Sequence, residues 1–155
     1  MLKNQEIAET AIREARKTID YNTVEYPIEY FTDQINQQQI DNNLNWSESK
    51  RSYFIESLML GLPVFNIIFI DKDNDCGYSV IDDVEQLIDG KQRLLTALNF
   101  VNGNLRLSNL KVLDSLNGFT FKDLPLYRQR RFVRTTVKAI AVNPKSDLSV
   151  WKDYV

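Results

Sequence analysis

Histidine is absent from the 155 residues of this chain, and cysteine occurs only once, at Cys76. Without histidine the chain cannot form an HNH or other histidine–metal nuclease centre, nor a triad with a histidine base. A single cysteine excludes an internal disulfide and a multi-cysteine zinc site. Any catalysis here must use carboxylates, Lys, Arg, Tyr, Ser or Thr, or an acquired metal ion.

Long apolar runs are also missing. No apolar stretch approaches the roughly 20 residues that a membrane-spanning helix needs. Segment 1–6 turns polar and acidic where a signal peptide would be apolar. We therefore expect a cytoplasmic protein with no membrane partner. An apolar content of 43% with 26% charged residues is typical of a globular chain, and the length predicts one domain over residues 1–155.

Charge is distributed unevenly, although the net charge is only −2. Residues 1–90 carry 7 basic and 17 acidic side chains, a net charge of −10, whereas residues 91–155 carry 12 basic and 4 acidic side chains, a net charge of +8. The C-terminal part could therefore offer a phosphate-binding surface. The alternative is simply a dipolar molecule.

One basic stretch in the C-terminal part is a candidate DNA-binding surface, because clustered arginines contact phosphates. Its arginines are Arg128, Arg130, Arg131 and Arg134. The alternative is an exposed helix face that balances the acidic part of the molecule.

Apolar spacing predicts helices that alternate with short strands. Helices are expected over residues 1–20, 28–35, 48–60 and 90–101. The third has Ser47 as N-cap and Gly61 as a left-handed residue after its C-terminus. Strands are expected over residues 21–26, 64–70, 78–81, 84–88 and 132–142. This alternation predicts an α+β fold with a small mixed sheet and surrounding helices.

For two further features we prefer a structural role to a ligand-binding role. Segment 71–77, with Asp82 at the twelfth place, superficially resembles a calcium-binding EF-hand loop. It lacks the glycine at position six and the glutamate at position twelve, so a hairpin turn is expected. Trp46 could stack on a base, but its apolar neighbourhood favours a core or helix-anchoring role.

The run Asp89-Gly90-Lys91-Gln92-Arg93 is the strongest candidate site. A predicted strand ends here, glycine lets the backbone approach a ligand, and a helix then begins with free N–H groups and the positive end of its dipole. Lys91 and Arg93 add positive charge, and Arg93 can bind a phosphate bidentately. Asp89 could hold Mg²⁺ or orient an attacking water, and Gln92 could position that water or read a base edge. The alternative is an Asp cap, a Gly turn and a solvated first helical turn.

Three segments together resemble one family. Trp46–Val64 resembles its tryptophan, helix and "IESLLLGLPIP" segment, Ile88–Phe100 resembles its "IDGQQRLTTLLNF" signature, and Leu116–Pro125 resembles its "nGktfddLp" stretch. The match spans about residues 25–142, in the family's order. On these motifs the chain is identified as a member of the N-terminal domains of GmrSD-type modification-dependent restriction nucleases.

The resemblance implies a ParB/sulfiredoxin-like α+β fold that binds, and often hydrolyses, a nucleoside triphosphate. It assigns catalytic roles to Asp89, Gln92 and Arg93, nucleotide binding to Gly90, Lys91 and Arg93, and Mg²⁺ to Asp89. In the family this chemistry is coupled to recognition or cleavage of modified DNA in phage defence.

Full-length relatives continue into a helical or HNH nuclease portion, which implies a nuclease domain or subunit as a partner. The chain alone is not expected to cut DNA. It departs from the family in two places: segment 41–46 lacks the usual Gln-Arg before the tryptophan, and Lys91 replaces the first glutamine of the signature. The alternative function is a stand-alone, non-catalytic module that binds DNA or protein, such as a regulator, decoy or inhibitor of such a system.

Overall fold

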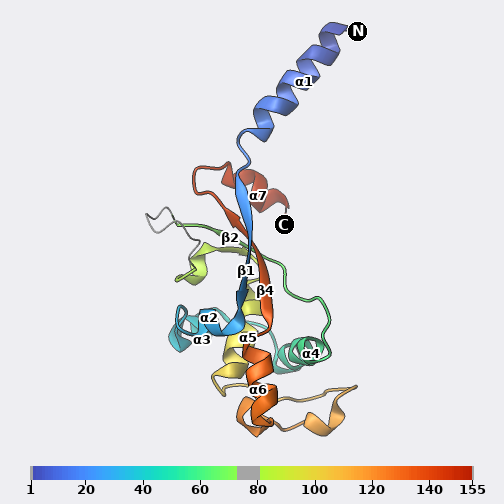
Figure 1. The fold of residues 1–155 in the computed structure, drawn as a ribbon, viewed down its shortest axis with the longest axis vertical. Helices are drawn as coiled ribbons and strands as arrows, with labels where there is room; N and C mark the ends of the chain where they lie inside the picture. The colour runs from blue at the N-terminus through green and yellow to red at the C-terminus, as the bar shows by residue number, and fades with distance from the viewer. Residues whose placement is uncertain (1, 73–80, 155) are drawn as a thin grey trace.

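A mixed β-sheet forms the centre of the molecule (Figure 1). The computed structural model describes residues 2–72 and 81–154, and the strand order within them is β1-β4-β2-β3. The strands are β1 (Tyr21–Pro27), β2 (Ile67–Ile70), β3 (Leu87–Asp89) and β4 (Thr136–Val142). β1 runs antiparallel to β4, β2 parallel to β4, and β3 antiparallel to β2. The predicted α+β class with a small mixed sheet is confirmed.

Residues of the inner strands alternate between two apolar layers, as the two-residue period of a strand requires. In β2, Ile67 and Phe69 enter the larger core and Ile68 the smaller one. The smaller core is closed by Trp151 of α7 (Leu148–Tyr154). The larger core is covered by α2 (Ile28–Thr32), α3 (Gln37–Asn43), α4 (Glu48–Met59), α5 (Lys91–Val101) and α6 (Leu126–Val133).

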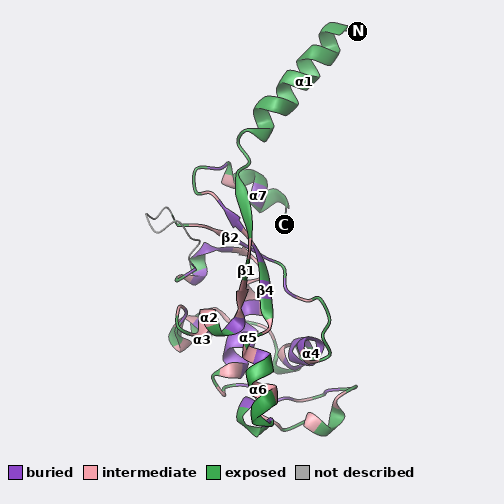
Figure 2. Cartoon of the chain, viewed as in Figure 1, coloured by how far each residue is buried: buried purple, intermediate pink, exposed green. Residues whose placement is uncertain are grey.

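Helix α5 is the central helix of the larger core (Figure 2). Every residue from Leu94 to Phe100 is buried, and the helix packs against α2, α3 and α4. Burying a leucine or phenylalanine stabilises a fold by about 1.5–3 kcal/mol, so this helix is firmly held. Its N-terminal turn therefore starts from a fixed position beside the end of β3.

Helix α4 begins and ends as its sequence predicts. The Oγ of Ser47 accepts a hydrogen bond from the backbone N–H of Lys50 (3.2 Å), and Gly61 beyond the C-terminus has a φ of 79°. The buried side of α4 also holds a distant loop. Glu56, which is 3% exposed, accepts hydrogen bonds from the backbone N–H groups of Val112 and Leu113 (3.0 and 2.9 Å).

Helix α1 (Leu2–Arg16) forms where the periodicity predicts it but buries none of its residues. It extends away from the sheet and its covering helices (Figures 1 and 2). The side chains of Ile7 and Ile12 are 60% and 55% exposed. Among the described residues, no helix is long and apolar enough to cross a membrane.

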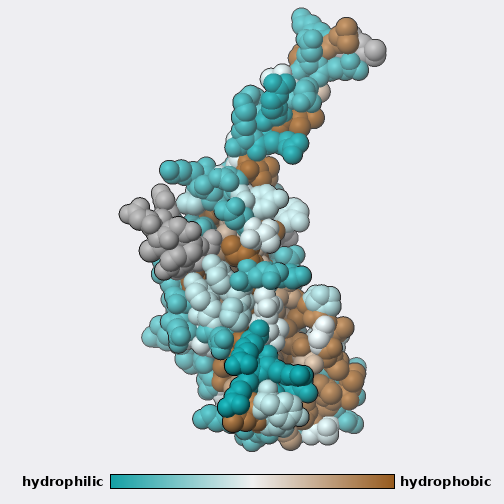
Figure 3. Space-filling view, viewed as in Figure 1, coloured by the Kyte–Doolittle hydropathy of each residue, from teal (hydrophilic) through white to brown (hydrophobic). Residues whose placement is uncertain are grey.

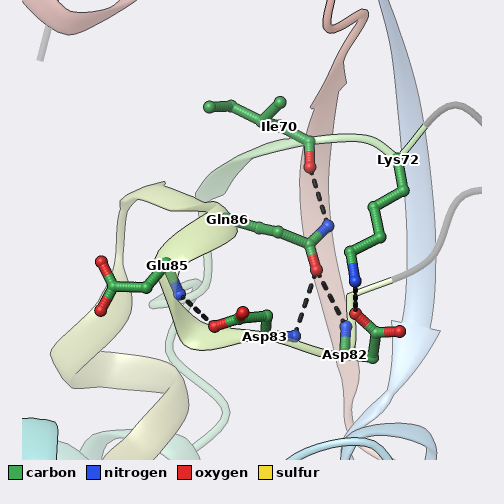
Figure 4. Close-up of polar contacts among 6 residues, drawn as sticks. All are labelled: Ile70, Lys72, Asp82, Asp83, Glu85 and Gln86. Atoms are coloured by element: carbon green, nitrogen blue, oxygen red, sulfur yellow. Dashed lines mark hydrogen bonds and ion pairs between the residues drawn. The ribbon is translucent and has the colours of Figure 1, made fainter.

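The predicted strand over 84–88 is correct only in its last part. Val84–Gln86 is a 3₁₀ turn, η1, and β3 begins at Leu87. The turn forms because the Gln86 side chain donates to the carbonyl of Ile70 (2.8 Å) and accepts from the N–H groups of Asp82 and Asp83 (both 3.1 Å). Figure 4 shows this arrangement together with the ion pair between Lys72 and Asp82.

The remaining differences are local. Helices α3 and α7 were not predicted, because neither has a clear apolar period of its own. The strand predicted over 132–142 begins only at Thr136, because helix α6 extends to Val133, and the strand predicted over 64–70 begins at Ile67. Cys76, most of the predicted turn over 71–77 and residues 78–80 of the predicted strand lie outside the described residues. Ile81, the last residue of that predicted strand, is buried but is not in a strand. Between α5 and α6 the chain forms two further 3₁₀ turns, η2 (Asp114–Leu116) and η3 (Phe121–Asp123).

Candidate functional site

An open depression lies at the junction of β3 and α5. Its volume is about 650 Å³. The lining residues are Trp46, Leu87, Ile88, Asp89, Gly90, Lys91, Gln92 and Arg93. The structure thus places all five residues of the predicted motif around one solvent-accessible space.

Gly90 connects the strand to the helix in a conformation that favours glycine. Its φ is 82°, in the left-handed region. A Cβ atom at this position would lie 2.5 Å from the Cγ2 atom of Ile67 and 3.1 Å from the Nη2 atom of Arg93. Both the backbone angle and the close approach of β2 therefore require the absence of a side chain.

The first turn of α5 has free hydrogen-bond donors. Gly90 is the N-cap and has no side chain to accept from them, and the first backbone bond within the helix runs from Leu94 to Gly90 (3.1 Å). The N–H groups of residues 91–93 therefore have no partner within the helix. Together with the helix dipole, they give this end of α5 a positive potential.

Arg93 is held in place by two contacts. Its Nη2 atom donates to the carbonyl oxygen of Asn66, just before β2 (2.9 Å), and lies 3.6 Å from Oδ2 of Asp89. The side chain remains 29% exposed. Its Nε and Nη1 atoms have no partner among the described residues, so the guanidinium group is positioned and still has donors for a ligand.

Lys91 differs from Arg93 in having no partner. Within residues 2–72 and 81–154, its ammonium group makes no hydrogen bond or ion pair. A cation near a helix N-terminus opposes the dipole by about 0.3–1 kcal/mol. Lys91 is therefore slightly unfavourable for folding unless an anion is bound nearby.

Gln92 has a role that sequence reasoning missed. Its Nε2 atom donates to the carbonyl of Asn43 (2.8 Å), and its Oε1 atom accepts from the N–H groups of Asn45 (2.9 Å) and Trp46 (3.4 Å). The amide group is thus engaged with the backbone before α4 and fixes Trp46 beside the depression. No local pattern could have revealed this, because the partners lie 46–49 residues away in sequence.

Asp89 is the residue that the sequence suggested as a ligand of Mg²⁺. Among the described residues, no group of three or more His, Cys, Asp or Glu side chains could hold a metal ion. The side chain of Asp89 is 42% exposed and borders the depression. One carboxylate is compatible with Mg²⁺, which is commonly bound through one or two carboxylates, water and substrate phosphates.

The four predicted DNA-binding arginines do not form one uniform surface. Arg130, Arg131 and Arg134, at the end of α6, are exposed, and Figure 3 shows a strongly hydrophilic area where α6 lies. Arg128 is half-buried, lies 5.6 Å from the ring of Tyr127 and borders an apolar groove of about 270 Å³. The groove is otherwise lined by Met59, Leu60, Leu113, Leu116, Leu124 and Pro125.

The chain matches a protein-family model. The model described as the N-terminal domain of GmrSD restriction endonucleases covers residues 28–152. The chain belongs to this family. The GmrSD match includes the depression at β3 and α5, the Trp46 segment and α6, whereas α1 lies outside it.

Membership of the GmrSD N-terminal family identifies the chain as a component of a restriction system. Searches of the curated proteins and of the solved structures found no match. A ParB/sulfiredoxin-like fold is a more specific assignment than the α+β class, and it remains a prediction.

Proposed function

We propose that the depression at the start of α5 binds the phosphates of a nucleoside triphosphate, as part of a restriction system that acts on DNA. The observation that carries this proposal is the combination of uncapped N–H groups with Lys91, a cation that has no partner among the described residues. Each element alone would be ordinary. Together they form a site whose electrostatic cost is relieved by a bound anion.

The phosphate would be held by three kinds of donor. The N–H groups of residues 91–93 bind oxygen atoms at the end of the helix. Lys91 approaches as a flexible point charge, and Arg93 presents Nε and Nη1 from a fixed position. Gly90 allows the chain to turn from β3 into α5 close to Ile67, where a Cβ atom would clash, and so sets the position of these donors.

Asp89 is the proposed ligand of a Mg²⁺ ion that arrives with the nucleotide. A bound Mg²⁺ would neutralise phosphate charge and favour hydrolysis. Arg93, beside Asp89, would stabilise negative charge on the phosphate. Gln92 contributes by holding segment 43–46 in place, so we assign it a positioning role.

The test is the variant Lys91→Ala, which should make the fold more stable but nucleotide binding weaker. Removing a cation from the helix N-terminus should raise the free energy of unfolding by about 0.3–1 kcal/mol. Losing a charged hydrogen bond to phosphate should weaken binding by about 1.5–3 kcal/mol, which is about tenfold or more in Kd. Urea denaturation measures the first effect, and calorimetric titration with Mg²⁺ and each nucleoside triphosphate measures the second.

The matched control is Lys111→Ala, which removes an exposed lysine away from the depression. It should leave nucleotide affinity unchanged. If Lys91→Ala and Lys111→Ala bind every nucleotide as the natural sequence does, or if no nucleotide binds to any of them, the proposal is wrong. A stand-alone, non-catalytic module would then be the better description.

A second candidate function is DNA contact through Arg130, Arg131 and Arg134, favoured by the exposure of all three at the end of α6. Binding should weaken steeply with salt, since each neutralised phosphate adds about −0.9 to the log–log slope. Replacing Arg130 and Arg131 by alanine should flatten that slope by up to about 2 and affect all DNA sequences alike. An unchanged slope would mean that these arginines are a solvated face, and an acidic protein, such as a nuclease subunit, would become the favoured partner.

A further inference from the structure

A second pocket lies on another side of Trp46. It has a volume of about 260 Å³ and is separate from the depression at β3 and α5, although Trp46 lines both. Its lining residues are Asp41, Leu44, Trp46, Arg51, Asn99 and Asn104. They come from α3, the segment before α4, α4 itself, α5 and the loop after it.

This pocket contains hydrogen-bond donors that the protein does not satisfy. Asn99 is only 2% exposed. Its Oδ1 atom accepts from Gln37 (3.1 Å), but its Nδ2 atom has no partner among the described residues. The Arg51 side chain lines the pocket, and its guanidinium group makes no hydrogen bond or ion pair among the described residues. Polar groups in folded proteins are nearly always hydrogen-bonded to protein or water. The amide of Asn99 and the guanidinium group of Arg51 therefore leave donors at this pocket for an acceptor atom of a ligand.

The same pocket also offers acceptors and an aromatic surface. Asp41 is exposed, and one of its oxygen atoms is engaged by Gln37 (2.7 Å), which leaves the other for a ligand. The indole of Trp46 is fixed by an edge contact with Phe54 at 5.9 Å and by the ammonium group of Lys50 at 4.6 Å. Donors, a carboxylate and an aromatic ring together suit a planar heterocycle that has both N–H groups and acceptor atoms at its edge.

The position of the pocket relates it to the proposed phosphate site. Lys91 and Asn99 lie eight residues apart on α5, which corresponds to about 12 Å along the helix axis. Residues Leu94 to Leu98 of α5, which lie between them, are buried, so a nucleotide with its phosphates at the helix N-terminus would reach the pocket past Trp46, which lines both spaces. Gln92 supports such an arrangement because it ties Trp46, the residue common to both spaces, to the first turn of α5.

We propose that the pocket around Asn99 and Arg51 binds the base of the nucleotide whose phosphates occupy the depression. The donors of Asn99 and Arg51 meet acceptor atoms of the base, and Asp41 accepts from its N–H groups. This inference rests on the proposed function, which it extends from phosphate binding to base recognition. It predicts that a nucleoside triphosphate binds more tightly than inorganic triphosphate.

The experiment compares inorganic triphosphate with the four ribonucleoside triphosphates, each with Mg²⁺, on the full chain. Calorimetry gives the affinities, and the fluorescence of Trp46 reports on the pocket directly. The background from Trp151, the other tryptophan, is removed by Trp151→Phe in all samples. We expect at least one nucleotide to bind tenfold or more tightly than inorganic triphosphate and to change the Trp46 emission.

Two variants then separate base recognition from phosphate binding. Asp41→Asn changes an exposed side chain, and Arg51→Gln removes the guanidinium group. Either should bring the affinity for the preferred nucleotide toward that of inorganic triphosphate without changing the affinity for inorganic triphosphate itself. Lys91→Ala should weaken both ligands. Circular dichroism confirms that each variant is folded.

The outcomes distinguish the two proposals. Equal affinities for inorganic triphosphate and all nucleotides, or a nucleotide preference that survives both variants, would overturn the base pocket and leave the phosphate site standing. No binding of any of these ligands would overturn the phosphate site and the base pocket together.

Discussion

Replacing Gly90 by alanine tests the local geometry on which the candidate site depends. Two costs can be read from the structure. Placing a non-glycine residue at a φ of 82° costs about 1–2 kcal/mol. The new Cβ atom would also lie 2.5 Å from Cγ2 of Ile67, and forcing an extra methyl group into a packed core costs about 1–3 kcal/mol. The expected loss in the free energy of unfolding is therefore about 2–5 kcal/mol.

Gly103 provides a matched control for this substitution. Its φ is also 82°, but a Cβ atom there would meet nothing within 4 Å. Gly103→Ala should therefore lose only about 1–2 kcal/mol from the backbone angle. Both substitutions restrict the unfolded chain in the same way, so this effect cancels in the comparison. The difference between the two variants isolates the contact with Ile67.

A third variant tests the contact itself. Leucine is not branched at Cβ, so Ile67→Leu removes the atom that the alanine side chain would meet, and by itself it should cost less than about 1.5 kcal/mol. In the double variant much of the excess loss of Gly90→Ala should be recovered. Urea denaturation of the natural sequence, the two single variants Gly90→Ala and Ile67→Leu, and the double variant completes a double-mutant cycle. Equal losses for Gly90→Ala and Gly103→Ala, or no coupling with Ile67→Leu, would refute the idea that close packing of β2 requires glycine here.

Three further results are expected. Gln92→Ala should cost about 1–3 kcal/mol through the lost hydrogen bonds to segment 43–46, and the amide hydrogen of Asn45 should exchange faster by NMR; unchanged exchange would contradict the positioning role. Asp123 accepts hydrogen bonds from the N–H and hydroxyl groups of Thr120, and these bonds lower the pKa of its carboxyl group below the usual 3.8. The stability that the ionised carboxylate contributes is therefore present above pH 3.8 and is lost as the pH falls through the lowered pKa. Thr120→Ala should raise the pKa of Asp123 in an NMR titration. The chain alone should not cut modified or unmodified plasmid DNA with Mg²⁺ or Mn²⁺; site-specific cleavage by the pure protein would show that this domain does more than we expect.

The features that the sequence predicts well are those decided within a few residues. The cap at Ser47, the left-handed glycine after α4 and the strand-to-helix junction at Gly90 all depend on local backbone chemistry, and the structure confirms each of them. The motif from Asp89 to Arg93 was located from this junction together with the family resemblance, and its five residues line one depression. The preferred structural role of Trp46 also fits, since it packs against Phe54.

The features that the sequence does not predict depend on contacts between distant segments. The amide of Gln92 reaches Asn43 across 49 residues, so its engagement with the backbone could not be inferred from the motif alone. The same holds for the pocket at Asn99, which lies in an apparently ordinary helical stretch. Helix α1 shows the opposite case: its periodicity correctly predicts a helix, but periodicity does not say whether anything covers the apolar side.

The two surfaces proposed to meet phosphate lie toward opposite ends of α5. The depression surrounds its first turn, whereas Phe100, near its last turn, packs against Phe132 of α6 at a ring-centre distance of 5.3 Å. An 11-residue helix is about 16 Å long, which exceeds the Debye length of about 8 Å at physiological salt. A nucleotide at one end and DNA at the other would therefore repel each other little through solvent. If both proposals hold, the chain should bind the two ligands at the same time, and any coupling between them must pass through the buried helix rather than through competition for one basic surface.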